Sequence, residues 1–196
     1  MKESAVFGIY GASDSGKTSL IIKLVKQLTN EGFRVATVKI TNKNIGIDTI
    51  GKDTWKHGQA GSKLVVLSSP VETSLLFKEK KDLDTILKYI HGLGSYDVIL
   101  IEGANDKDTP KIRLGDIPER ENTIFTYNGD YNSLYEIIKN EIFRRKNMKG
   151  INIKINGKPI QLTEFPSEII MNTICGMLKS LKGVEEIKDV EIRFEL

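Results

Sequence analysis

Apolar and polar positions alternate in blocks whose spacing predicts strands and helices in turn. Short runs rich in β-branched side chains predict strands, and apolar residues that recur every three or four positions predict helices. The expected strands are 5–10, 34–40, 64–67, 97–101 and 123–127, with 71–77 as a further extended segment, and the expected helices are 17–28, 54–59, 82–91 and 134–142. Because strands that alternate with helices form βα units, we predict an α/β fold with a mainly parallel sheet flanked by helices, and ligands at the carboxyl ends of the strands.

The pattern changes near residue 148. The expected elements of the last part are a hairpin of 151–155 and 158–162, a helix that begins near Pro166, and a last strand, 187–196. Asn156-Gly157 separates the two hairpin strands and tolerates the left-handed backbone of a tight turn. We therefore divide the chain into a main domain, 1–148, and a small C-terminal ββαβ (α+β) domain, 149–196. A unit of under about 50 residues is marginal by itself, so we expect it to dock on the main domain or to pair with another copy.

The residues from Gly11 to Thr18 read Gly-Ala-Ser-Asp-Ser-Gly-Lys-Thr and lie between the first predicted strand and the first predicted helix. This G-x-x-x-x-G-K-T spacing is typical of a phosphate-binding loop (P-loop), in which backbone N–H groups surround a polyphosphate. Lys17 can reach the outer phosphates, the Thr18 hydroxyl can ligate Mg²⁺, and the positive end of the helix dipole faces the anion. Asp14 is discordant in an anion-binding loop, and we expect its side chain to point outward. The sequence therefore predicts a P-loop NTPase-type domain that binds a nucleoside triphosphate.

Two acidic positions lie on the same expected rim of the sheet. Asp48 begins the run Asp-Thr-Ile-Gly in a long polar loop, 41–53, where its carboxylate can approach Mg²⁺. The alternative for Asp48 is an Asx turn or a cap before the next helix. Glu102 follows the most apolar strand and can ligate Mg²⁺ or orient water, or it can be a hydrogen-bonded acid at a strand end. We take Lys17, Asp48 and Glu102 as candidate catalytic residues, and Thr18, Asp48 and Glu102 as candidate metal ligands.

Other polar residues of the rim have two interpretations each. Four lysines could reach anionic groups there or be solvated surface lysines: Lys39, Lys43, Lys52 and Lys111. Asn128 and Asp130 could accept hydrogen bonds from the edge of a guanine base, although the sequence has no Asn-Lys-x-Asp motif at that point. They could equally form a tight turn that caps the last helix of the main domain. The sequence alone decides neither the role of the four lysines nor that of Asn128 and Asp130.

Composition narrows the classes of partner. The 29 Lys and Arg residues exceed the 26 Asp and Glu residues only slightly, and a formal charge of +3 is too small to indicate nucleic-acid binding. The single cysteine, Cys175, excludes an internal disulfide, and with two scattered histidines it indicates no zinc site. No apolar stretch approaches the roughly 20 residues that span a bilayer, and the N-terminus lacks a signal-peptide pattern. We expect a soluble cytoplasmic protein without nucleic-acid or membrane partners.

A series of short motifs carries a more specific resemblance. In order they are the phosphate loop; a strand that ends at Lys39; Asp48-Thr49-x-Gly51-Lys52-Asp53-Thr54-Trp55-x-His57; Ala60-Gly61-Ser62 before an apolar strand; Ile101-Glu102-Gly103; and Pro110-Lys111-Ile112. Together they resemble the molybdopterin-guanine dinucleotide biosynthesis protein B family, MobB. The similarity covers about residues 4–145, and its most distinctive part is 48–61. The tail resembles segments fused to some archaeal members of that family.

The resemblance implies a GTP-binding protein with weak GTPase activity that assists the partner enzyme MobA, which attaches GMP to molybdopterin. The residues that it assigns to the phosphates and Mg²⁺ are Gly11, Ser13, Ser15, Gly16, Lys17, Thr18 and Ser19. Asp48, Asp53 and Glu102 would form the acidic side of that site. Family members usually carry histidines soon after the second strand, where this chain has Thr-Asn-Lys-Asn at 41–44, and Asp14 replaces the usual small residue.

Our leading hypothesis is a Mg²⁺-dependent GTP-binding adaptor for molybdenum or tungsten cofactor maturation. MobA is the expected partner, molybdopterin a further candidate ligand, and a homodimer the expected assembly. Hydrolysis should be slow, because no catalytic arginine or glutamine is evident near the phosphate loop. Two alternatives stay open: an ATP-dependent ligase or small-molecule kinase on the same scaffold, and a nucleotide-dependent interaction module without functional hydrolysis.

Overall fold

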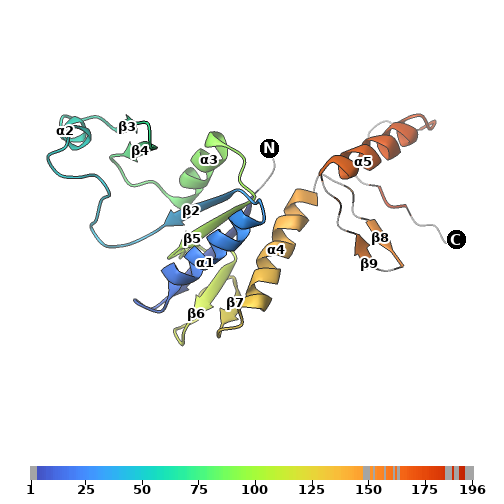
Figure 1. The fold of residues 1–196 in the computed structure, drawn as a ribbon, viewed down its shortest axis with the longest axis horizontal. Helices are drawn as coiled ribbons and strands as arrows, with labels where there is room; N and C mark the ends of the chain where they lie inside the picture. Colours follow the sequence, from blue (N-terminus) through green and yellow to red (C-terminus); the bar gives the residue numbers. More distant parts are fainter. Residues whose placement is uncertain are drawn as a thin grey trace.

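A five-stranded parallel sheet carries the fold (Figure 1). The computed structural model describes residues 4–147, 151, 153–156, 158–160, 162, 164–183, 187 and 190–192. The sheet consists of β1 (Ala5–Gly11), β2 (Val35–Lys39), β5 (Val98–Glu102), β6 (Lys111–Leu114) and β7 (Thr123–Tyr127). Their spatial order is β2-β5-β1-β6-β7, and every neighbouring pair is parallel. The carboxyl ends of these strands therefore meet at one rim, where α/β folds commonly bind ligands.

Helices cover both faces of this sheet. They are α1 (Lys17–Asn30), α3 (Leu83–Leu93) and α4 (Tyr131–Asn147). α1 and α4 pack on one face, through a core that includes Phe7, Leu24 and Ile138, whereas α3 packs on the other face against Ile99 and Ile101. Strand β5 is buried on both sides from Val98 to Ile101, as the apolar run of these residues predicts. In the described part of the chain, none of the helices combines the length and hydrophobicity that crossing a bilayer requires.

The predicted α/β fold with a mainly parallel sheet is confirmed, but the sequence pattern misses one of its strands. β6 is only four residues long, and the charged Lys111 and Arg113 interrupt its apolar residues. It nevertheless lies inside the sheet, between β1 and β7. Pairing with two neighbours, rather than its own hydrophobic pattern, makes this segment a strand.

The segments 64–67 and 71–77, expected as a strand and a further extended segment, lie outside the main sheet. They form β3 (Leu64–Ser68) and β4 (Thr73–Phe77), which pair with each other as a separate antiparallel hairpin. A parallel pair needs a crossover of about a dozen residues, and the turn between these strands is far shorter. The short helix α2 (Asp53–Gln59) precedes the hairpin.

The C-terminal part contains the expected hairpin and helix. β8 (Ile153–Ile155) and β9 (Lys158–Ile160) are antiparallel, and Asn156 in their turn has the left-handed backbone that the Asn-Gly pair predicts, with φ 53°. α5 (Glu164–Lys179) follows. The expected last strand, 187–196, lies mostly outside the described residues, and those described there are not in a strand. The division of the chain into two domains stays a prediction.

Candidate functional site

The loop between β1 and α1 closes tightly over the end of the sheet. Gly11 is the last residue of β1, and a Cβ atom there would lie 2.6 Å from Ser15 Oγ and 2.7 Å from the Leu114 carbonyl oxygen of β6. Only glycine permits so close an approach. α1 begins at Lys17, directly after Gly16, so its unpaired N–H groups and the positive end of its dipole face the loop.

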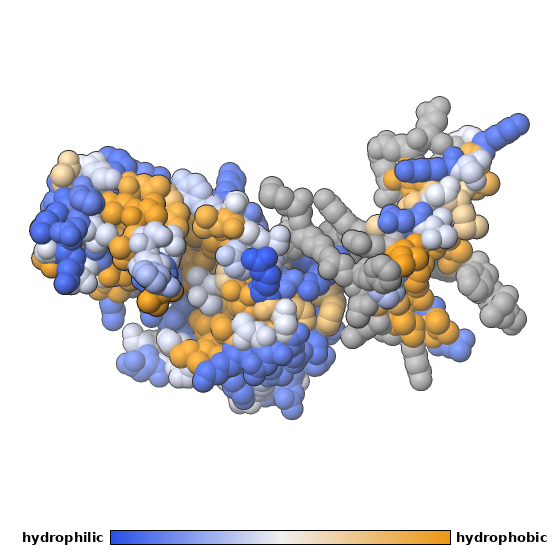
Figure 2. All heavy atoms as spheres, turned by 45° about the horizontal axis from the view of Figure 1, so that its top comes forward, coloured by the Kyte–Doolittle hydropathy of each residue, from blue (hydrophilic) through white to orange (hydrophobic). Residues whose placement is uncertain are grey.

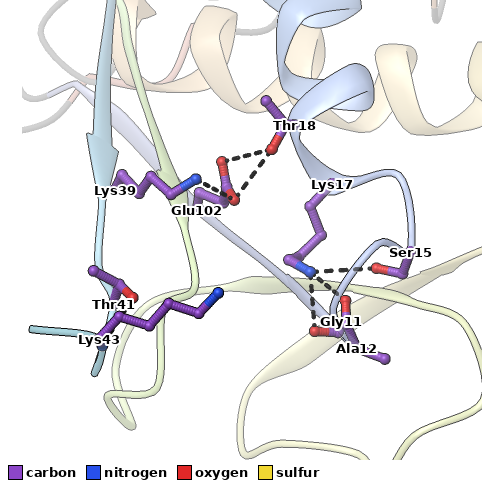
Figure 3. Close-up of polar contacts among 9 residues, drawn as sticks. All are labelled: Gly11, Ala12, Ser15, Lys17, Thr18, Lys39, Thr41, Lys43 and Glu102. Atoms are coloured by element: carbon purple, nitrogen blue, oxygen red, sulfur yellow. Dashed lines mark hydrogen bonds and ion pairs between the residues drawn. The ribbon is translucent and has the colours of Figure 1, made fainter. Parts of the chain in front are cut away.

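The side chain of Lys17 lies over this phosphate loop. Its ammonium donates hydrogen bonds to the carbonyl oxygens of Gly11, at 3.2 Å, and Ala12, and it lies 3.4 Å from Ser15 Oγ. All of these partners belong to the loop itself (Figure 3), so the positive charge is held where an anion would enter. This position suits the phosphate contact that the sequence predicts for Lys17.

Glu102 links the phosphate loop to a neighbouring strand. Thr18 Oγ1 lies 3.3 and 3.2 Å from the two carboxylate oxygens of Glu102, and Lys39 Nζ lies 3.1 Å from Oε1 (Figure 3). The Glu102 side chain is 15% exposed, whereas the Lys39 side chain is 60% exposed. The carboxylate is therefore held between a hydroxyl of α1 and an ammonium at the end of β2.

The donor chemistry of Thr18 and Glu102 suits Mg²⁺. Both side chains offer hard oxygen ligands, and Mg²⁺ commonly takes only one or two carboxylates from a protein, with phosphate oxygens and waters as its other ligands. Among the described residues, no group of three or more histidine, cysteine, aspartate or glutamate side chains could hold a metal ion. Thr18 and Glu102 would supply two ligands of a metal at this rim, and waters or phosphate oxygens would supply the others.

Asp48 makes a different contact from the one that the sequence predicts. Lys78, directly after β4, donates to its Oδ2, and Thr54 Oγ1 of α2 donates to its Oδ1 at 2.8 Å. Asp53 is exposed in the first turn of α2. α2 and the β3–β4 hairpin lie at the far left of Figure 1, well away from the phosphate loop. The structure does not bring Asp48 or Asp53 to Glu102, and their place at a metal stays a prediction.

We expect the Asp48 contact to hold the segment 41–53 at neutral pH and to release it in acid. The Lys78 ammonium, followed by the Thr54 hydroxyl, lowers the pKa of the Asp48 carboxyl. Because the folded-state pKa is depressed, the contact stabilises fully above the ordinary carboxyl pKa of about 4 and is lost as the pH falls through the folded value. Limited proteolysis at neutral pH should cut 41–53 several-fold faster in Asp48→Asn than in the wild type. Asp53→Asn is the control with an exposed carboxylate, and cleavage of Asp48→Asn at the wild-type rate would contradict the contact.

Lys111 is neither an anion-binding rim lysine nor a solvated one. It is fully buried in β6, and its ammonium donates to the carbonyl oxygens of Thr109, at 2.8 Å, and Glu121, at 2.9 Å. Both sequence-based alternatives for this residue were therefore wrong, because they depended on a loop position and the residue lies inside the sheet. The buried ammonium joins the connection from β5 to β6 with the connection from β6 to β7.

The structure bears out the capping turn for Asp130. The Ser133 N–H donates to Asp130 Oδ1 at 3.1 Å, and Ser133 Oγ donates to Oδ2 at 2.6 Å, at the start of α4. These side-chain and backbone hydrogen bonds lower the pKa of the Asp130 carboxyl. Asn128 Oδ1 accepts a hydrogen bond from the Asp130 N–H at 3.2 Å. Both side chains thus form hydrogen bonds in the turn before α4.

Comparison with known proteins identifies the family. The model of the MobB family, described as molybdopterin guanine dinucleotide synthesis protein B, matches residues 6–140, more than half of the chain. The chain belongs to the MobB family. A Methanocaldococcus jannaschii protein, provisionally named a molybdopterin-guanine dinucleotide biosynthesis adapter protein, is 26% identical over 97% of each chain. The molybdopterin-guanine dinucleotide biosynthesis adapter protein of Haemophilus influenzae is 33% identical over 56% of this chain and 62% of its own. The crystal structure of Bacillus subtilis MobB has a TM-score of 0.56 at 17% identity, covers 70% of this chain and 97% of that one, and thus shares the fold.

The residues that match the MobB model include the whole candidate site. Several residues of the phosphate loop are exposed to solvent. Ser13 and Ser19 are exposed, and Asp14 is exposed with a left-handed backbone, φ 58°, as an outward side chain allows. The ion pair between Lys39 and Glu102 was not predicted from the sequence. The sequence shows that each residue ends a strand, but only the order of the strands in the sheet brings β2 beside β5.

Proposed function

We propose that this MobB-family chain is a Mg²⁺-dependent GTP-binding adapter in molybdopterin guanine dinucleotide biosynthesis. The observation that carries the proposal is the contact of Thr18 with Glu102 beside Lys17 and the phosphate loop. The loop and Lys17 would hold the β- and γ-phosphates, and Thr18 and Glu102 would hold the metal. When bound, Mg²⁺ neutralises charge on the phosphates. Guanine as the base, and a MobA-type enzyme as the partner, follow from the family and not from a contact.

Weak GTPase activity is part of the proposal. Lys17 contacts the phosphate loop and Lys39 contacts Glu102, and both are lysines. Arg113 of β6 lies beside Tyr10 in the sheet, but its guanidinium donates to Thr126 and to the Ile117 carbonyl oxygen. Lysine acts as a point charge, whereas arginine offers a rigid fork of donors to a phosphoryl group in its transition state. We therefore infer slow turnover by the chain alone and faster turnover where a partner supplies such a group.

Calorimetry with GTP and ATP, each in Mg²⁺ and in EDTA, tests the nucleotide half of the proposal. We expect GTP to bind more tightly than ATP, and only Mg²⁺ to give full affinity. Tight selectivity for ATP would instead favour a ligase or small-molecule kinase.

The proposed adapter role is tested by the rate at which a MobA-type enzyme forms the dinucleotide from molybdopterin and GTP, with and without the chain. An undiminished effect of Glu102→Gln would favour an interaction module in which hydrolysis has no role.

An exposed apolar surface on the β3–β4 hairpin supports the proposed homodimer. Leu64 and Val66 lie opposite Phe77 and Leu75 on one face of the hairpin, and these four side chains, the hairpin face, are 38–54% exposed. Figure 2 shows hydrophobic side chains gathered over this end of the molecule. A two-stranded hairpin is marginal by itself, and exposed apolar patches commonly mark protein contacts. We assign the hairpin face to a second copy of the chain.

Val66→Glu should therefore shift the chain from dimer to monomer. A charge in the centre of an apolar contact is buried without a partner, and we expect the dimer dissociation constant to rise by about a hundredfold. Sedimentation equilibrium measures this change. Ile124→Glu, an equivalent change at an exposed position of β7, is the control and should leave the dimer intact. A monomeric wild type would contradict the assignment.

A further inference from the structure

The register of the sheet places Lys39 beside Glu102. They are the last residues of the parallel strands β2 and β5 and lie opposite each other. The Ile40 N–H donates to the Glu102 carbonyl oxygen at 2.8 Å. Gly103 keeps these strand ends together, because a Cβ atom there would lie 2.5 Å from the Ile40 carbonyl oxygen and its φ is +86°. The backbone of Lys39 is thus fixed, and only its side chain is free to turn.

The Lys39 ammonium and a divalent cation would compete for one oxygen atom. Lys39 Nζ lies 3.1 Å from Glu102 Oε1, and Thr18 Oγ1 lies 3.3 Å from the same atom. A metal ligated by Thr18 and Glu102 would place its charge within a few ångströms of the ammonium, where repulsion is strong. Because the lysine side chain is 60% exposed and the glutamate side chain only 15% exposed, the lysine is the side chain that can move.

A displaced Lys39 remains beside the phosphates. Figure 3 shows its side chain extending from β2 toward Glu102, on the side of the rim where Lys17 and the phosphate loop lie. In P-loop proteins the metal bridges the β- and γ-phosphates. The γ-phosphate of a nucleoside triphosphate held by the loop would then be an anion within reach of the released ammonium, and a nucleoside diphosphate has no γ-phosphate.

We propose that Lys39 compensates the charge of Glu102 and, when Mg²⁺ holds that carboxylate, binds the terminal phosphate of the nucleotide. The inference rests on the proposed Mg²⁺-dependent GTP binding and assigns to Lys39 a share in the distinction between a nucleoside triphosphate and a diphosphate. The exchange of partners needs a rotation of one side chain and no change in the strands.

A Mg²⁺ titration without nucleotide tests the competition for Glu102. Lys39→Met removes the ammonium and keeps an apolar side chain, so Mg²⁺ should raise the thermal unfolding midpoint of this variant at an about tenfold lower concentration than in the wild type. Lys107→Met is the matched control. Lys107 Nζ also lies near a glutamate, 3.9 Å from Glu121 Oε2, but this pair is not at Glu102. Its Mg²⁺ dependence should equal that of the wild type. Equal Mg²⁺ dependence of Lys39→Met and the wild type would overturn the competition.

Calorimetry with GTP and GDP in Mg²⁺ tests the contact with the terminal phosphate. The preference of the wild type for GTP over GDP should fall by about tenfold in Lys39→Met, since one charge-assisted contact to the last phosphate is lost. Lys39→Arg keeps the charge and should keep most of the preference, and Lys107→Met should keep all of it. An unchanged preference in Lys39→Met would overturn this contact. A wild type that binds neither nucleotide would refute the proposed function and this contact with it, whereas the Mg²⁺ titration would still decide the competition.

Discussion

Replacing Lys17 with alanine is expected to lower the affinity for GTP by at least about a hundredfold, which corresponds to about 2.7 kcal/mol. The ammonium is the cation of the phosphate loop, and its hydrogen bonds are with Gly11, Ala12 and Ser15 of that loop. A charged donor that meets a phosphate in a pocket of backbone N–H groups contributes more than a neutral hydrogen bond. Calorimetry in Mg²⁺ measures the loss directly.

The same substitution should leave the fold intact, because Lys17 is outside both hydrophobic cores of the sheet. We expect a change in unfolding free energy of no more than about 1 kcal/mol, measured by denaturant titration. Lys26→Ala is the matched control, since it removes an exposed lysine from the same helix, outside the loop. It should bind GTP as the wild type does. Wild-type affinity in a folded Lys17→Ala protein would refute the assignment of the loop to phosphate.

The part of the fold that local pattern determines was predictable from the sequence. β5 is apolar and buried from Val98 to Ile101, and the helical spacing after Lys17 gives α1 with its buried stripe. β6 was not predictable in this way, because Lys111 and Arg113 interrupt it and only its neighbours in the sheet make it a strand. For the β3–β4 hairpin the sequence predicted the extended segments but not their pairing, which depends on the length of the turn between them.

In the candidate site, too, local sequence predicted some residues, whereas other contacts depend on the arrangement of the whole fold. The phosphate loop and Glu102 were predictable because each is fixed by the strand directly before it. Asp48 lies in the long segment 41–53, where no regular element sets its direction, and it pairs with Lys78 from a distant part of the sequence. The ion pair of Lys39 with Glu102 depends on which strand lies beside β5, and that is a property of the whole sheet. Motifs therefore identified the loop, and topology decided which charges meet there.

Replacing Lys111 with alanine is expected to cost about 3 kcal/mol of unfolding free energy. The fully buried ammonium satisfies the carbonyl oxygens of Thr109 and Glu121, and alanine would leave both without this donor as well as a cavity. The Lys111 charge also acts on the carboxyl group of Asp106. Burial raises the pKa of the Asp106 carboxyl, but the hydrogen bonds from Thr109 and the Lys111 charge bring it below its ordinary value. Its Oδ2 is buried and has no hydrogen-bond partner among the described residues.

Denaturant unfolding separates the two parts of the Lys111 effect. Lys111→Met fills most of the cavity but supplies no donor, so it should recover only the packing part and remain about 2 kcal/mol less stable than the wild type. Lys107→Ala removes a lysine whose side chain is 80% exposed and should change stability by less than about 0.5 kcal/mol. Wild-type stability in Lys111→Ala would mean that the two carbonyl groups find water instead. Full recovery in Lys111→Met would mean that the stem of the lysine, and not its charge, holds the two connections together.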